Sequence, residues 1–113
     1  MFKPTAFILL LVASSQLFAG ASSGNGKITE LYINAKGTLV RLQFSEGIIN
    51  PAGCQKSNYY IAELDQSNGD SRFLASLVAA YAAQSTIMFW INGCTTHPHW
   101  GGTQPKLNDI YMR

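Results

Sequence analysis

The chain has 113 residues, a formal net charge of +2 and only 12% charged residues. That length accommodates a single domain beside a targeting segment. Its basic residues do not cluster, which excludes the basic stripe of a nucleic-acid-binding protein or of a protein that binds anionic membranes. A domain of this size has a small hydrophobic core, so an additional covalent constraint would help to stabilise it.

The first residues have the pattern of a secretory signal peptide. A short basic start with Lys3 precedes the apolar run 6–13, and small residues follow it up to Ala21. An apolar run of this length is too short to cross a bilayer core, which needs about 20 apolar residues. We expect a signal peptide over residues 1–19, with cleavage after Ala21 as the alternative, no membrane span, and a mature protein that is secreted or periplasmic.

The two cysteines predict one disulfide. Cys54 and Cys94 are the only cysteines of the chain, and export would bring them into an oxidising compartment, where disulfides persist. The loop that this bond would close has about 40 residues, which corresponds to roughly 4 kcal/mol in the chain-entropy model. Two free buried thiols are the alternative.

The first half of the mature chain predicts strands. Residues 20–26 are polar and rich in glycine, so we expect a flexible lead-in before a domain over residues 27–113. Residues 28–33 are rich in branched and aromatic side chains, and residues 38–44 alternate apolar with polar side chains. A turn between them predicts a hairpin with one buried face, and residues 58–64 predict a third strand.

Residues 71–83 change to a helical period. The large apolar side chains fall on one stripe of a helix, at Phe73, Leu74, Leu77, Val78 and Tyr81. Asp70 or Ser71 is positioned to cap the first turn. Another face carries small residues, at Ala75, Ala79 and Ala82. Two interpretations of that face stay open: it packs against a second subunit, or it is a plain alanine-rich surface.

Two further strands follow the helix. Residues 86–91 are apolar on both faces, which is typical of a central strand, Asn92-Gly93 predicts a turn, and residues 107–112 predict a last strand. A mainly β chain with three strands, one helix and two strands has the arrangement of the OB-fold, a five-stranded, partly open barrel. The disulfide would tie the crossover that carries the helix at both ends.

Several stretches resemble a known family. They are NPAGC, NYYIAEL, the helix SRFLASLVAAYAAQS, the strand TIMFWINGC and the closing KLNDIYMR. They are similar to small exported bacterial proteins whose shape resembles the B subunits of subtilase-cytotoxin-like and pertussis-like toxins. The resemblance implies an OB-fold subunit that assembles into a homo-oligomer, a pentamer, and binds a glycan on host cells.

Residues 94–102 contain the candidate binding residues. His97 and His99 have donor atoms for a metal ion, but a structural zinc site needs four ligands and a catalytic one three. Two exposed loop histidines are therefore the preferred interpretation, and we expect no metal and no cofactor. Trp100 precedes two glycines and has a flat apolar ring of the kind that stacks on a sugar. The alternative is that Trp100 folds back over the end of the barrel.

The sequence contains no catalytic motif. No nucleophile elbow is present, no free cysteine adjoins a histidine, and no motif places two carboxylates as acid and base. We therefore expect an exported binding module that is not an enzyme, with a glycan ligand bound at Trp100, His97 and His99. The alternative is a small periplasmic accessory or inhibitor protein that acts through protein–protein contacts.

Overall fold

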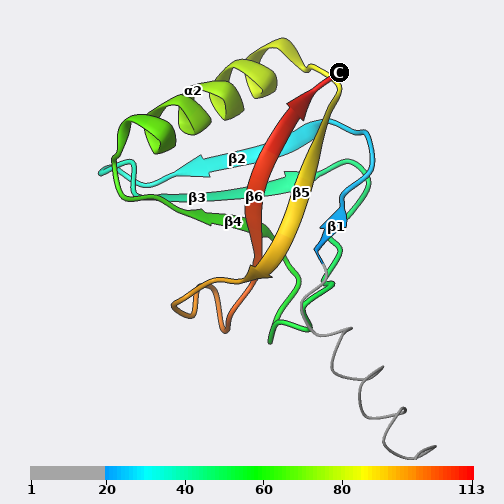
Figure 1. The fold of residues 1–113 in the computed structure, drawn as a ribbon, viewed down its shortest axis with the longest axis vertical. Coiled ribbons are helices and arrows are strands. Elements are labelled where there is room, and N and C mark those ends of the chain that lie inside the picture. Colours follow the sequence, from blue (N-terminus) through cyan, green and yellow to red (C-terminus); the bar gives the residue numbers. More distant parts are fainter. Residues whose placement is uncertain (1–19) are drawn as a thin grey trace, which may run out of the picture.

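The computed structural model describes residues 20–113, so the predicted signal peptide at 1–19 lies outside the described residues. The described chain forms one mixed sheet and one helix (Figure 1). The elements are β1 (Ala21–Ser22), β2 (Ile28–Ile33), β3 (Leu39–Phe44), β4 (Tyr60–Glu63), α2 (Asn68–Ala83), β5 (Ile87–Cys94) and β6 (Pro105–Met112). The sheet order is β1-β5-β6-β4-β3-β2, and only β4 and β6 are parallel neighbours. The prediction of a mainly β domain with one helix is confirmed for this part of the chain.

The hairpin of β2 and β3 follows its sequence pattern. Val40, Leu42 and Phe44 are buried, whereas the residues that alternate with them are half-buried on the opposite face. The turn is held by Asn34, whose side-chain oxygen accepts hydrogen bonds from the backbone N–H groups of Thr38 and Leu39, at 2.8 and 3.1 Å. One face of the hairpin therefore belongs to the core, and the other is available for a surface site.

The sheet has six strands and is not closed within the described residues, where the prediction was a five-stranded barrel. Its two edges, β1 and β2, are successive segments of the chain. Gly26, which lies between them, forms an antiparallel bridge with Ile87 at the start of β5. The sheet is therefore strongly curved, and β5 and β6 cross β2, β3 and β4 steeply in Figure 1.

The segment expected to be a flexible lead-in instead pairs with the sheet. Ala21 and Ser22 form β1 against β5, and the buried Ser23 exchanges two hydrogen bonds with the backbone of Phe89, both 2.9 Å long. The pairing uses main-chain groups and one hydroxyl group. A search for apolar patterns therefore does not detect it.

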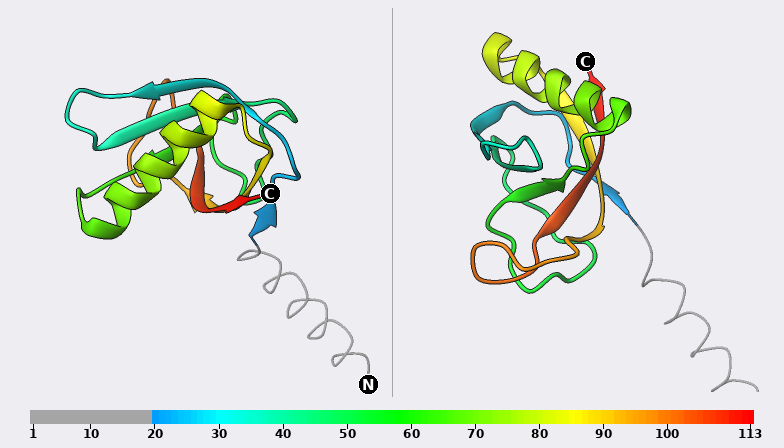
Figure 2. Two further views of the ribbon diagram at one scale, coloured as in Figure 1. Left: turned by 90° about the horizontal axis from the view of Figure 1, so that it is seen from above. Right: turned by 90° about the vertical axis from the view of Figure 1, so that its left-hand side faces the viewer.

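The helix differs from its prediction at its start and on its buried face. It begins at Asn68 and is capped by Ser67, whose hydroxyl accepts from the backbone N–H of Asp70, instead of by Asp70 or Ser71. Only Leu77 and Ala80 are fully buried. Val78 and Tyr81 are 43% and 38% exposed. The helix α2 lies across the sheet, as seen from above in Figure 2, and the strands that it contacts most are β2 and β6.

The second half of the sheet extends beyond the predicted bounds. β5 continues through Asn92 to Cys94, and Gly93 with φ +76° lies at an irregularity in its pairing with β6. The prediction of a turn at Asn92-Gly93 is therefore wrong. The predicted disulfide is present: Cys54 and Cys94 have Cα atoms 5.6 Å apart. It ties the segment before β4 to the end of β5, at the base of the loop that carries Trp100.

Candidate functional site

The loop between β5 and β6, residues 95–104, is built by its own hydrogen bonds. At its base the N–H of Thr95 donates to the carbonyl of Gln104, at 2.9 Å, and at its tip the N–H of His99 donates to the carbonyl of Gly102, at 2.8 Å. Trp100 reverses the chain direction with φ +51°. The indole is therefore presented from a tight turn with a defined backbone.

Gln104 connects this loop to the segment before β4. Its side chain is fully buried. The amide nitrogen donates to the carbonyl of His99 at 3.0 Å, and the amide oxygen accepts from the N–H groups of Asn58 and Tyr59 at 3.0 and 3.4 Å. One side chain thus fixes both the loop that carries Trp100 and the segment that carries Tyr59.

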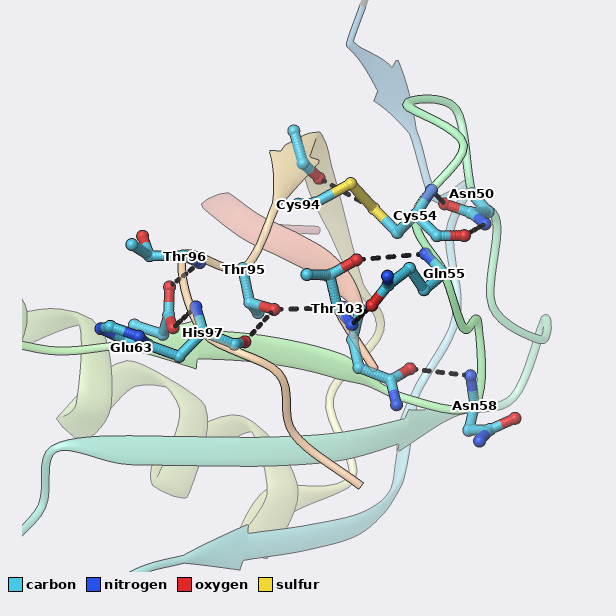
Figure 3. Close-up of a disulfide and its surroundings, with 12 residues drawn as sticks. Asn50, Cys54, Gln55, Asn58, Glu63, Cys94, Thr95, Thr96, His97 and Thr103 are labelled. Carbon is cyan, nitrogen blue, oxygen red and sulfur yellow. Dashed lines mark hydrogen bonds between the residues drawn. A yellow bond between two sulfur atoms is a disulfide. The ribbon is translucent and has the colours of Figure 1, made fainter. Parts of the chain in front are cut away.

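Glu63, at the end of β4, holds the other side of the loop (Figure 3). Its carboxylate accepts from the N–H groups of Thr96 and His97, at 2.7 and 3.1 Å, and lies 3.0 Å from Nε2 of His99. Burial alone would raise the pKa of Glu63. The hydrogen bonds from Thr96, His99 and His97 outweigh that effect and lower the pKa below its ordinary value.

Three aromatic rings surround the guanidinium group of Arg41 on the outer face of β2 and β3. We call Tyr32, Tyr59, Trp100 and Arg41 the aromatic patch. The guanidinium carbon lies 4.3 Å from the ring centre of Tyr59, 4.6 Å from that of Trp100 and 5.2 Å from that of Tyr32. Contacts of this kind contribute about 0.5–2 kcal/mol each, depending on how far they exclude water.

Other contacts complete the aromatic patch. Tyr32 meets Trp100 edge to face, with ring centres 5.5 Å apart. Arg41 also donates to the carboxylate of Glu30 at 3.3 Å, while its buried Nε has no hydrogen-bond partner in the described chain. An unpartnered buried donor is costly, and the surrounding rings offset part of that cost. The arginine therefore acts as the centre around which the rings are arranged.

The structure brings together only some of the residues singled out in the sequence. Trp100 is 40% exposed, so its side chain is neither buried in the core nor fully surrounded by solvent. His99 is half-buried and lies beside Trp100, with ring centres 6.2 Å apart. His97 is exposed. The disulfide between Cys54 and Cys94 lies at the base of the loop, where β5 ends.

A groove of about 480 Å³ lies between the β2–β3 hairpin and the loop. We call it the hairpin groove, and its lining residues are Asn34, Thr38, Leu39, Glu63, Leu64, Asp65, Thr96, His97 and His99. His99 belongs to both the groove and the edge of the aromatic patch, so the two adjoin. The volume is in the range of pockets that hold small ligands.

A second groove, of about 490 Å³, lies between the start of α2 and the diverging strands β4 and β6. Phe73, Lys106 and Asp109 are among its lining residues. In residues 20–113 no three His, Cys, Asp or Glu side chains are placed to hold a metal ion together. The one helix of that same range is not long and apolar enough to cross a membrane.

Sequence reasoning missed Arg41, Glu63 and Gln104. Arg41 had a signal, because it alternates with buried residues on a predicted strand and therefore had to face outward. Glu63 and Gln104 had none, since their partners lie far along the chain or in a loop. In comparisons with known proteins the chain matches no family model, no curated protein and no solved structure.

Proposed function

We propose that this chain is an exported, non-catalytic binding module with an OB-fold-like, partly open barrel, and that it binds a glycan. The aromatic patch carries this proposal. Two of its rings, Trp100 and Tyr32, are 40% and 38% exposed, yet both are fixed in position around Arg41. A large exposed ring that is already held in place stacks on a ligand at little cost in conformational entropy.

The sheet topology supports the OB-fold part of the proposal. With β2 to β6 as the five strands of the barrel, the helix falls between the third and fourth strands. OB-folds bind oligosaccharides and oligonucleotides on the face of strands 2 and 3, between the loops that join strands 1 to 2 and 4 to 5. The corresponding elements here are β3, β4, the β2–β3 turn and the loop 95–104. They carry Arg41, Trp100 and the lining of the hairpin groove, while Tyr32 of β2 and Tyr59, just before β4, complete the aromatic patch.

The chemistry of the patch suits a sugar better than a nucleic acid. A pyranose ring has an apolar C–H face that stacks on indole, and its hydroxyl groups need hydrogen-bond partners at the rim. The hairpin groove offers carboxylate, hydroxyl and imidazole groups beside the indole. Its lining residues include neither lysine nor arginine, whereas a phosphate backbone requires them.

A glycan array probed with the oxidised mature protein tests the proposal. We expect binding that Trp100→Ala weakens at least tenfold and Trp100→Phe weakens less. Tyr111→Ala is the matched control, because Tyr111 is 46% exposed on β6 and lies outside the aromatic patch. Far-ultraviolet circular dichroism verifies that each variant folds. A silent array, or equal losses for Trp100→Ala and Tyr111→Ala, would contradict the proposal.

A second candidate is a periplasmic accessory or inhibitor protein that acts through protein contacts. The exposed face of α2 favours it, since Val78 and Tyr81 are exposed there beside Ala79 and Ala82 without a charged neighbour in that turn. Mass measurement in solution separates the candidates. A homo-oligomer such as the pentamer of toxin B subunits, or a toxin catalytic subunit encoded next to this chain, favours the first. A monomer that captures one specific protein favours the second.

A further inference from the structure

The hairpin groove has a charge pattern that restricts what it can bind. Two of its lining residues, Glu63 and Asp65, are acidic, and none is lysine or arginine. Of its two histidines, His99 already faces the carboxylate of Glu63, with Nε2 3.0 Å from Oε2. An incoming group therefore meets carboxylates and hydrogen-bond acceptors without a lysine or arginine among the lining residues.

Both carboxylates are ionised at neutral pH. The hydrogen bonds from the loop keep the pKa of Glu63 below its ordinary value despite burial. A hydrogen bond from the backbone N–H of Ser67, at 2.9 Å, is the main cause that lowers the pKa of Asp65, which is exposed. Glu63 is half-buried and already accepts from three donors, whereas Asp65 is exposed and accepts one backbone hydrogen bond, from Ser67, with the side chains of Ser67 and Asp70 beside it. Asp65 is therefore the acceptor that a ligand hydroxyl can reach.

Three basic groups lie near the hairpin groove, and none of them lines it. The guanidinium of Arg41 donates to Glu30 and is enclosed by the rings of the aromatic patch, and its side chain is only 19% exposed. Lys36 lines a separate, smaller pocket beside Leu74. Lys106 lines the second groove, which Glu63 and Asp65 also line.

We infer that the hairpin groove binds a sugar residue without an acidic group, and that it selects against uronic acids, sialic acids and sulfated or phosphorylated sugars. This inference rests on the proposed glycan binding. Hydroxyl groups donate to Asp65, while Leu39 and Leu64 contact the C–H face of the ring. An acidic substituent loses its hydration beside like charges and finds no lysine or arginine among the lining residues in exchange.

The test uses a glycan array printed in matched pairs. Each pair differs only in one acidic group, as glucose differs from glucuronic acid, or a galactose terminus from its sialylated form. We expect the neutral member of a pair to bind about tenfold more tightly at low salt, and the ratio to shrink as salt screens the charges.

Two variants locate the discrimination. Asp65→Asn removes one charge but keeps the oxygen that accepts from Ser67, so we expect acidic members to gain about threefold and neutral members to change little. Asp109→Asn is the control, because it changes the net charge equally but does not line the hairpin groove. We expect the ratio of neutral to acidic affinity in that control to equal the wild-type ratio. Amide NMR shifts on adding the tightest neutral glycan should include Thr38 and Thr96.

The outcomes separate the inference from the proposed function. Preference for acidic members, an unchanged ratio in Asp65→Asn, or NMR shifts confined to other parts of the chain would overturn the inference and leave glycan binding intact. An array that is silent for both members of every pair would contradict the proposed function itself, and the assignment of the groove with it.

Discussion

The loop 95–104 and the helix α2 expose an aromatic residue to nearly the same extent but hold it differently. Trp100 is 40% exposed in the loop, and Tyr81 is 38% exposed on the helix. The two elements lie at opposite ends of the domain in both Figure 1 and the right-hand view of Figure 2. Exposure alone therefore does not distinguish the two surfaces.

The contacts around each residue do distinguish them. Trp100 packs against a guanidinium and against the rings of Tyr32 and Tyr59, and its loop is fixed by a buried amide and a carboxylate. Tyr81 has no aromatic or cation–π contact in the described chain. Because a fixed ring loses less entropy on binding, the loop is the better candidate for a small ligand and the helix for a broad protein contact.

The substitution Gln104→Met should have the largest effect, and it should affect the loop. It keeps the side-chain volume but leaves the carbonyl of His99 and the N–H groups of Asn58 and Tyr59 without their partner. We expect the free energy of unfolding to fall by about 3 kcal/mol, measured by urea denaturation. Gln43→Met is the control: its single hydrogen bond to Asn58 is exposed, so we expect a loss below about 1 kcal/mol. Equal losses would mean that the loop is not specially held.

The hydrogen bonds of Glu63 predict how the stability of the protein changes at acid pH. Its folded-state pKa lies below the ordinary 4.5, so its stabilising contribution is present above that pH and is lost as the pH falls through the folded-state value. Thermal melts should therefore show a decline below about pH 4.5 that is shallower in Glu63→Gln. At pH 7 that variant should lose about 1–2 kcal/mol, since an amide cannot accept from all three donors. Glu46→Gln, in an exposed turn, should leave the pH profile unchanged.

Arg41→Lys should have a smaller effect, confined to the aromatic patch. Lysine keeps the charge but cannot lie flat among three rings, so we expect a loss of about 1 kcal/mol in stability and greater mobility of Trp100 by fluorescence anisotropy. Arg72→Lys, on the exposed first turns of α2, is the matched control. If Arg41→Lys leaves the indole as rigid as in the wild type, Arg41 does not organise the patch.

The fold could be predicted from the sequence where a regular spacing of apolar residues determines which side chains are buried. Val40 and Leu42 alternate with half-buried residues as the sequence indicates, and the disulfide follows from the presence of only two cysteines. The face that α2 buries could not be predicted. Val78 belongs to the predicted apolar stripe but is exposed, whereas Ala80 is buried. Which of them faces the sheet depends on the angle between helix and sheet. Nor could it be predicted that the sheet of the described residues stays open, since closure depends on how far a curved sheet brings its edges together.

The candidate site was predicted only in part. Trp100 and His99 were singled out and do adjoin each other. Their setting depends on Arg41 and Gln104, which contact residues that are distant in sequence or lie across a loop. Such contacts leave no local pattern, and a buried glutamine looks like a surface glutamine in the sequence.

Val78→Ser should have the smallest effect, and for that reason it is the most informative test of the helix. Val78 is 43% exposed, so in a free monomer the substitution should change the free energy of unfolding by less than about 0.5 kcal/mol. Leu77→Ala, next to it and fully buried, should cost about 2–4 kcal/mol. The test is denaturation at two protein concentrations together with mass measurement. A loss above about 1 kcal/mol for Val78→Ser that grows with protein concentration would mean that a second copy covers this face, and the helix would then be a functional surface equal to the loop.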